Sequence, residues 1–393
     1  MENEKYVRNR LNGMLVAKFI SDTGTWISVV LILLYTNEVA VIKAQGISLV
    51  FALRVLMPLL LTPMLAKFVD RFPTGKWLVA CDLLAASIAL AIPYSNSVMT
   101  TAIVAGTLST VTAIHFSAFN RLLKAYTPKG KIKASILKQS LLEGISLLGG
   151  TSLAGIVGSQ FSFKVGFAMD ALSFVASAAV VMFVFGFYKV KNVKMAAEVQ
   201  EEKPFKILSI RTMPWLLLIS TFAAICFGLR DTTLIQLMVN ELGMQKGIYA
   251  IAVAVGGAGG ILGNLFANRI SLRKAYAGLV IVFFAIAILY AGIAFSKSAL
   301  LLFPVIFMLG LIEACYYYFR SHIFFTITPD DHLARGAGLF KIFNATARSG
   351  GVLIIGLGFS FLQPSQQFVL FAVIALVAAS VSYFFRPSVV ESK

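Results

Sequence analysis

The sequence predicts an all-α membrane protein with about twelve transmembrane helices in two six-helix bundles. Three observations predict this class: the composition, the recurrence of long apolar runs, and the placement of basic residues between those runs. Of the 393 residues, 59% are hydrophobic and only 13% are charged, and the mean hydropathy is +0.86. Soluble domains carry roughly a quarter charged residues, so lipid must solvate much of this surface.

Apolar runs long enough to cross a hydrocarbon core of about 30 Å recur along the whole chain. Runs of roughly 18 to 24 residues are typical of membrane-spanning helices. The expected spans are residues 12–36, 44–66, 77–95, 98–120, 136–160, 165–188, 212–237, 246–268, 275–295, 299–321, 336–361 and 366–385.

The longest polar stretch divides these runs into two halves. It covers residues 189–211 and reads KVKNVKMAAEVQEEKPFKILSIR, so we expect a cytoplasmic linker there. This predicts an N-terminal bundle over 1–188 and a C-terminal bundle over 212–393. Asp22 in the first run and Asp231 in the seventh hold similar places, each followed by a threonine. This similarity indicates two related halves that rock around a central site.

The placement of basic residues predicts that both termini are cytoplasmic. Alternate loops hold most of the lysines and arginines, whereas the loops between them hold only Lys43, Lys164, Lys246 and Lys297. Basic residues near span ends resist translocation, so the rich loops should face the cytoplasm of a multi-pass protein in the inner or plasma membrane. The net charge of +17 is thus a topology signal, and we expect no nucleic-acid partner.

Several function classes are excluded by missing patterns. Cys81, Cys226 and Cys315 are single cysteines inside apolar runs, without the paired spacing of a metal site or a redox motif. No glycine-rich loop precedes a Lys-Ser or Lys-Thr pair, so ATP hydrolysis is not expected. No nucleophile has an evident base. We therefore expect neither an enzyme, nor a cofactor, nor a bound metal.

Short motifs resemble a known transporter family. The loop AKFVDRFPTGK, residues 66–76, resembles the G-x-L-A-D-R-x-G-R-K signature of the major facilitator superfamily. The segments ISDTGTW (20–26), DLL (82–84) and GFAMDALSF (166–174) resemble its branch of macrolide and enterobactin exporters. The resemblance implies the superfamily fold, alternating access and export.

The chain departs from the family patterns at a few positions. Ala66, Pro73 and Thr74 replace signature residues of the loop, which leaves Asp70 and Arg71 as the expected gating residues. In the fifth run, GGTSLAG (149–155) resembles the antiporter Gly-Pro motif with Thr151 in place of proline. Proton antiport is therefore an inference from the family.

Ionisable residues inside the apolar runs are the candidates for substrate and proton binding. A charge at membrane depth costs several kcal/mol unless it faces a cavity or a partner. The candidates are Lys18, Asp22, Arg54, Glu143, Arg230, Asp231, Glu313 and Arg348.

In the first half, Lys18 and Asp22 are four residues apart and share a helix face. Asp22 either binds a proton or a cationic substrate, or forms a structural ion pair with Lys18. Arg54 has no acidic residue in its own run, so we expect Asp22, Glu143 or a substrate carboxylate as its partner. Glu143 is expected near the cytoplasmic end of its span.

In the second half, Glu313 is expected to carry a proton, ahead of a structural pair with Lys341 or Arg348. Arg230 and Asp231 are adjacent, and their side chains should leave the helix about 100° apart. We therefore expect one of the two to pair across helices.

The remaining polar residues are assigned structural roles. His115 is expected to be a satisfied interior histidine rather than a proton relay. Asp82 and Asp170 are expected near span ends, where they cap or pair without touching the substrate. The glycines of the fifth and eighth runs predict close helix packing.

These observations favour an exporter of a small amphiphilic solute, a drug-like compound or a siderophore, that is exchanged for protons. Several buried cations against few carboxylates favour an anionic solute. The alternatives are a lysophospholipid flippase of the same fold and a receptor or scaffold that transports nothing. The expected partners are the solute, protons and the lipid bilayer, and the chain is expected to be monomeric.

Overall fold

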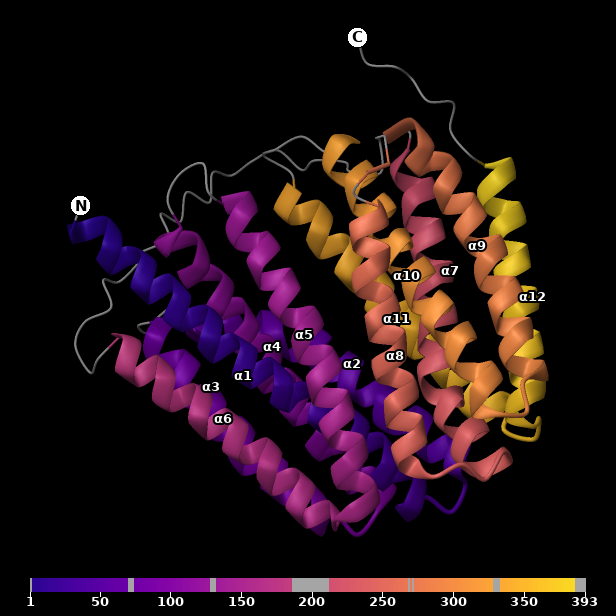
Figure 1. The fold of residues 1–393 in the computed structure, drawn as a ribbon, viewed down its shortest axis with the longest axis horizontal. Helices are drawn as coiled ribbons and strands as arrows, with labels where there is room; N and C mark the ends of the chain where they lie inside the picture. The colour runs from indigo at the N-terminus through magenta and orange to yellow at the C-terminus, as the bar shows by residue number, and fades with distance from the viewer. Residues whose placement is uncertain are drawn as a thin grey trace. The chain divides into compact units, whose positions relative to one another are not determined.

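The computed structural model describes residues 2–69, 74–127, 132–185, 212–267, 269–270, 272–327 and 333–385, and these form helices joined by short turns. The described α-helices are α1 (Glu2–Val39), α2 (Lys43–Val69), α3 (Thr74–Ala91), α4 (Val98–Tyr126), α5 (Ile132–Gln160), α6 (Phe163–Phe185), α7 (Met213–Ile235), α8 (Lys246–Ala267), α9 (Leu272–Phe295), α10 (Ala299–Ile327), α11 (Leu333–Gly358) and α12 (Pro364–Phe384) (Figure 1). Each expected apolar run coincides with one of these helices, which confirms the all-α class.

Ten of the described helices are long and apolar enough to cross a membrane. The other two, α5 and α11, contain shorter apolar stretches at Gly144–Gly158 and Ile342–Gly358. Their remaining turns include polar residues such as Lys138 and Arg335. These turns make each helix longer than its apolar stretch.

Side chains fix several helix ends. Ser97 and Thr100 form a capping box at the start of α4, in which the Ser97 hydroxyl accepts from the Thr100 amide over 3.1 Å. A 3-10 turn, η1 (Ile92–Tyr94), follows directly after α3. A π-helix, η3 (Gln236–Glu241), continues α7. The first residue of α12 is Pro364, and proline is favoured there because an N–H at the first helical position has no partner within the helix.

The chain forms two compact units, which are described separately. One comprises Met1–Glu198 with Gln245–Ala254, and the other comprises Val199–Met244 with Val255–Lys393. In the first unit, α1 packs against α4, α5 and α6, while α3 packs against α4 and α6. In the second unit, α7 packs against α11 and α12, and α9 packs against α10 and α12. The expected linker 189–211 lies outside the described residues, so the predicted domain boundaries stay predictions.

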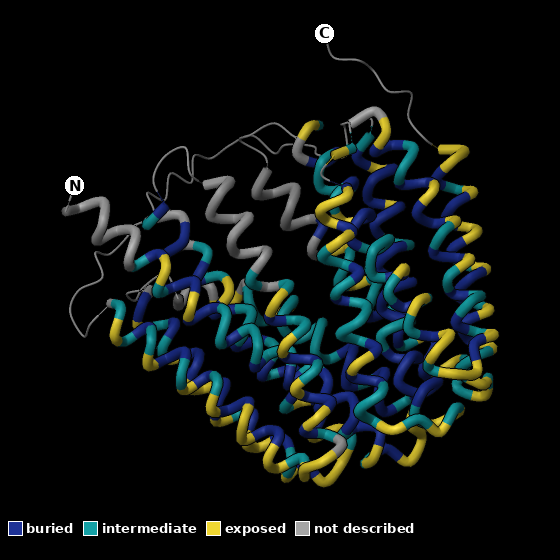
Figure 2. Tube along the Cα trace, in the orientation of Figure 1, coloured by how far each residue is buried: buried dark blue, intermediate teal, exposed yellow. Residues whose placement is uncertain are grey.

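The helices are apolar on their outer faces as well as their inner ones. On α9, Leu279, Phe283 and Tyr290 are buried, whereas Ile281 and Ile288 on the other face are exposed. Figure 2 shows this alternation of buried and exposed positions along the helices of each unit. A helix that is apolar all round belongs in lipid, so these exposed side chains form the membrane-facing surface.

Glycines allow close helix contacts in both units, as the sequence predicts. On α5, a Cβ at Gly150 would lie 2.5 Å from the Thr23 carbonyl oxygen of α1. On α8, Gly259 and Gly263 meet the backbone of α10 at Phe307 and Leu311. Gly149 has open space around it, so not every glycine of these runs serves packing.

Candidate functional site

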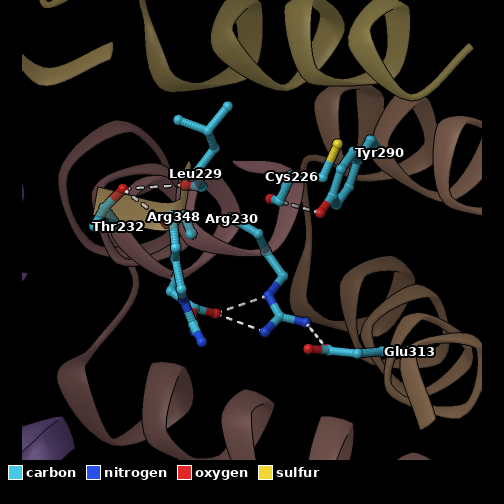
Figure 3. A network of polar contacts seen from close by, with 9 residues as sticks. Cys226, Leu229, Arg230, Thr232, Tyr290, Glu313 and Arg348 are labelled. Atoms are coloured by element: carbon cyan, nitrogen blue, oxygen red, sulfur yellow. Dashed lines mark hydrogen bonds and ion pairs between the residues drawn. The ribbon is translucent and has the colours of Figure 1, made fainter. Parts of the chain in front are cut away.

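Four charged side chains of the second unit form a continuous network. Arg230 and Asp231 come from α7, Glu313 from α10 and Arg348 from α11 (Figure 3). The Arg230 guanidinium donates through Nη1 to Glu313 Oε2, and through Nε and Nη2 to Asp231 Oδ1 over 3.0 and 2.6 Å. Arg348 Nη2 donates to the second Asp231 oxygen. The network therefore connects three helices through ion pairs.

The adjacent residues Arg230 and Asp231 both pair across helices, which corrects the expectation that only one would. Although their Cα–Cβ bonds diverge by about 100°, the long arginine side chain folds back so that its planar fork reaches both carboxylates. Glu313 pairs with Arg230 instead of Lys341 or Arg348. The Lys341 side chain lies outside the described part of the structure.

The network is only partly shielded. The side chains of its four members are between 16% and 33% exposed, with Arg348 the most open. Charges removed from bulk water at this level interact strongly, and the loss of one partner would leave another charge unpaired. The site is therefore tightly paired and partly open.

Small and aromatic residues of α7 make room for the network. A Cβ at Gly228 would lie 2.7 Å from Arg348 Cγ, so the glycine lets the Arg348 side chain pass. The Arg230 guanidinium lies 5.8 Å from the ring centroid of Phe227. The Tyr290 hydroxyl donates to the Cys226 carbonyl over 2.9 Å and fixes α9 beside this turn of α7.

In the first unit, Lys18 and Asp22 form the ion pair that their spacing predicts. The Lys18 ammonium also lies 5.2 Å from the ring centroid of Phe116 and 5.7 Å from that of Phe119. Both rings belong to α4, and such contacts stabilise a desolvated cation. The pair thus lies at the contact between α1 and α4.

Asp82 lies at the centre of a second polar cluster of the first unit. It is 1% exposed and accepts from Ser21 over 3.2 Å and from Ser177 over 2.6 Å. The Nε2 atom of His115 lies 3.4 Å from Asp82 Oδ1. These residues come from α1, α3, α4 and α6. The carboxylate points into the middle of four packed helices, seven residues from the start of the apolar segment Gly75–Tyr94. Its expected place near a span end stays a prediction, because burial among helices does not measure depth in a membrane.

Asp170 on α6 is also fully buried. The Ser28 hydroxyl of α1 donates to its Oδ2 atom. A Cβ at Gly24 would lie 2.8 Å from Asp170 Oδ1, so a side chain there would displace the Asp170 carboxylate. Asp82 and Asp170 do pair within the fold, as predicted. An isolated aspartate in an apolar run gave no signal of its partners, which lie far away in sequence.

Arg54 on α2 lies 3.4 Å through Nε from the Ser109 hydroxyl of α4. It is also within electrostatic range of Asp170, which was not among its expected partners. The Glu143 side chain and both gating candidates, Asp70 and Arg71, lie outside the described residues, and their expected roles stay predictions.

Within these clusters, carboxylates balance the cations. The second unit's network has two arginines and two carboxylates. In the first unit, Lys18 and Arg54 stand against Asp22, Asp82 and Asp170 among the described residues. The side chains of Glu143 and Lys341 lie outside the described residues, so the excess of buried cations expected for the whole chain stays a prediction.

Comparison with known proteins finds a family match and structural neighbours. The sequence profile described as "Major Facilitator Superfamily" matches residues 14–349. No curated protein sequence matches the chain. Among solved structures, the nucleoside transporter NupG has a TM-score of 0.74 at 13% identity, over 96% of this chain and 99% of that one.

Two further solved structures share the fold. A bacterial homologue of the human lysosomal transporter Spinster, in an inward-facing and unoccupied conformation, has a TM-score of 0.76 at 13% identity, over 98% of this chain and 99% of that one. A POT family transporter in complex with 5-aminolevulinic acid has a TM-score of 0.74 at 10% identity, over 96% of each chain. At these identities the likeness shows the fold alone.

Proposed function

Because this chain belongs to the Major Facilitator Superfamily, we propose that it is a secondary transporter that exports a small amphiphilic solute, a drug-like compound or a siderophore, in exchange for protons. The observation that carries the proposal is the network of Arg230, Asp231, Glu313 and Arg348, which connects three helices and is partly open. Export is supported by the resemblance of the N-terminal segments. The cytoplasmic placement of both termini is supported by the loop charges.

Glu313 is the proton carrier in this proposal. When ionised, it pairs with Arg230 and closes one side of the network. When it takes up a proton, it loses its negative charge and the pair with Arg230 weakens. Arg230 then relies on Asp231 alone, so the contact between α7 and α10 loosens. Protonation thus alters the packing of helices within the unit, which is what coupling to alternating access requires.

The charge of the solute decides the direction of coupling. A cationic or hydrogen-bond-donating group would compete with the proton for Glu313, and competition for one site gives antiport. A solute carboxylate that displaced Glu313 from Arg230 would favour protonation of the freed Glu313, so solute and proton would bind together and give symport. Antiport therefore requires that the solute presents a donor, not an anion, to Glu313.

Proton flux in liposomes tests the proposal. The purified chain is reconstituted with an internal pH-sensitive dye, and amphiphilic drugs and siderophores are added in turn. We expect solute-dependent proton movement that Glu313→Gln abolishes, because glutamine cannot exchange a proton. Asp22→Asn tests the candidate of the first unit. Glu241→Gln is the matched control, since Glu241 is exposed and caps α12 at the Ser365 amide, away from the network.

The outcomes separate the alternatives. Flux that survives both Glu313→Gln and Asp22→Asn would refute the assignment of the coupling site. Movement of solute and protons in the same direction would refute antiport. Movement of a lysophospholipid without proton flux would favour the flippase, and binding without any flux would favour a receptor.

A further inference from the structure

One face of α10 holds four residues in a stripe: Glu313, Tyr316, Tyr317 and Arg320. Their spacing of three, four and seven residues places them on the same side of the helix, one turn above the next. Contacts confirm this direction, because Glu313 reaches Arg230 of α7, Tyr317 reaches Phe227 of α7, and Arg320 reaches Phe340 of α11. We call these four residues the α10 stripe.

Arg320 is surrounded by aromatic rings. Its guanidinium carbon lies 5.9 Å from the ring centroid of Tyr316, 5.3 Å from that of Tyr317 and 5.8 Å from that of Phe340. It forms no ion pair with a carboxylate in the described part of the chain. It lies four residues from the end of the apolar segment Ala299–Phe324, on a turn where it is only half-buried.

The aromatic contacts stabilise the charge of Arg320 but do not occupy its hydrogen-bond donors. Cation–π contacts engage the faces of the rings and not the guanidinium N–H groups. An interaction with the Tyr316 hydroxyl engages part of the fork and leaves other N–H groups of the guanidinium for a ligand. A planar fork of this kind binds a carboxylate through two parallel hydrogen bonds. Arg320 therefore has the chemistry of an anion receptor. It differs from Arg230 and Arg348, whose forks already hold protein carboxylates.

Tyr317 is the accessible ring of the stripe. It is 37% exposed, whereas Tyr316 is 1% exposed and Phe340 and Phe227 are also buried. The buried rings hold Tyr317 and Arg320 in place, since Phe227 and Tyr316 both pack against Tyr317 at centroid distances of 5.7 and 5.3 Å. An apolar or aromatic solute could thus stack on Tyr317 without displacing a packed side chain.

We infer that the α10 stripe is the solute-binding surface of the second unit and that its ligand is an amphiphilic anion. The anionic group binds Arg320, the apolar body lies on Tyr317, and a donor group approaches Glu313. Seven residues of helix separate the Cα atoms of Arg320 and Glu313 by about 10 Å, which sets the spacing of the two polar groups. This inference rests on the proposed function and names its substrate class.

The stripe reconciles an anionic solute with proton antiport. An anion held by Arg320 does not take Arg230 away from Glu313, so it does not promote protonation there. The donor group at the other end of the solute competes with the proton at Glu313. Solute and proton then exclude one another, as exchange requires, although the solute carries a negative charge.

A binding experiment without any gradient tests the stripe. The full chain in phosphatidylcholine nanodiscs is titrated with 1-naphthylacetate and, separately, with its neutral isostere 1-naphthylacetamide. Equilibrium dialysis gives both affinities. The wild-type chain should bind the carboxylate more tightly than the amide. Arg320→Gln should weaken carboxylate binding by about tenfold or more, the scale of a lost charge-assisted pair, and leave amide binding unchanged.

Two variants and a control complete the design. Tyr317→Leu should weaken both probes equally, since it removes the stacking surface and keeps the charge. Arg320→Lys should retain part of the carboxylate preference, because it keeps the charge and loses the fork. Arg269→Gln, an exposed arginine between α8 and α9, removes the same charge elsewhere and should change neither affinity.

The inference is overturned if the wild-type chain shows no carboxylate preference or if Arg320→Gln keeps that preference. Competition of added phosphatidylglycerol with naphthylacetate at Arg320 would assign the anion site to a lipid headgroup and overturn the solute assignment. None of these results concerns proton flux, so the stripe can fail while Glu313-dependent antiport stands. Loss of antiport with an intact carboxylate preference would do the reverse.

Discussion

The neighbouring glycines of α5 offer a sharp test of the packing argument. Gly149 and Gly150 follow one another in the same helix, yet their surroundings differ. A Cβ at Gly149 would meet nothing within 4 Å, whereas one at Gly150 would lie 2.5 Å from the Thr23 carbonyl oxygen and 2.7 Å from Trp26 Cβ. Because the Thr23 atom is backbone of α1, it cannot rotate away as a side chain can.

The magnitude for Gly150→Ala follows from these distances. Ordinary van der Waals contact begins at 3.4 Å and the Cβ would lie at 2.5 Å, so α1 and α5 would have to separate by about 0.9 Å at this point. Overpacking of this kind typically costs about 1–3 kcal/mol. Replacing glycine by alanine inside a helix also gains about 0.5–1 kcal/mol. That gain is common to Gly149→Ala, so the difference between the two variants isolates the steric cost.

Thermal unfolding in detergent provides the assay. Cys81, Cys226 and Cys315 are buried, so a thiol-reactive fluorophore reports the loss of packing as temperature rises. We expect Gly149→Ala to unfold at or above the wild-type temperature and Gly150→Ala clearly below it. Equal unfolding temperatures for the two variants would refute the close approach of α1 and α5.

Two further predictions concern the charged clusters. Arg230→Leu should lower the free energy of unfolding by about 3–5 kcal/mol, because it leaves Glu313 without its cation. The double variant with Glu313→Leu should recover part of that loss. In thermal unfolding, a double variant less stable than the single one would contradict this prediction. Asp82→Leu should destabilise the first unit by about 1–3 kcal/mol for each of the Ser21 and Ser177 hydroxyls that it deprives of an acceptor, and wild-type unfolding of this variant would show that the cluster contributes nothing to stability.

Much of the helical plan was predictable because lipid imposes a simple rule on the sequence. The expected run 98–120 and α4 both begin at Val98. Ser97 lies just before the apolar run and also caps the helix. Hydropathy located the far end less well, because α4 continues to Tyr126 through polar turns outside the apolar segment. Apolar patterns mark where lipid begins, and a helix need not end there.

The candidate site was predictable where contacts are local. Lys18 and Asp22 pair within one helix, so their spacing alone predicts the contact. Arg230 and Glu313 are 83 residues apart, and Asp82 and Ser177 are 95 apart. Partners at such separations depend on which helices pack together. The sequence could therefore name Arg230 and Glu313 as candidates, but it could not join them, and it could not link Asp82 to Ser177.

The position of Asp82 also constrains how the first unit is made. Its hydroxyl donors belong to α1 and α6, the first and last of the unit's six leading helices. Domains form as units while the chain is synthesised from its N-terminus, so Ser21 is available to Asp82 early and Ser177 only after α6 has left the ribosome. Until then, an aspartate already surrounded by lipid and helices lacks one of its donors. The Asp82 cluster is therefore complete only when the sixth helix arrives, and a ribosome stalled before Ser177 would leave that cluster without one of its donors.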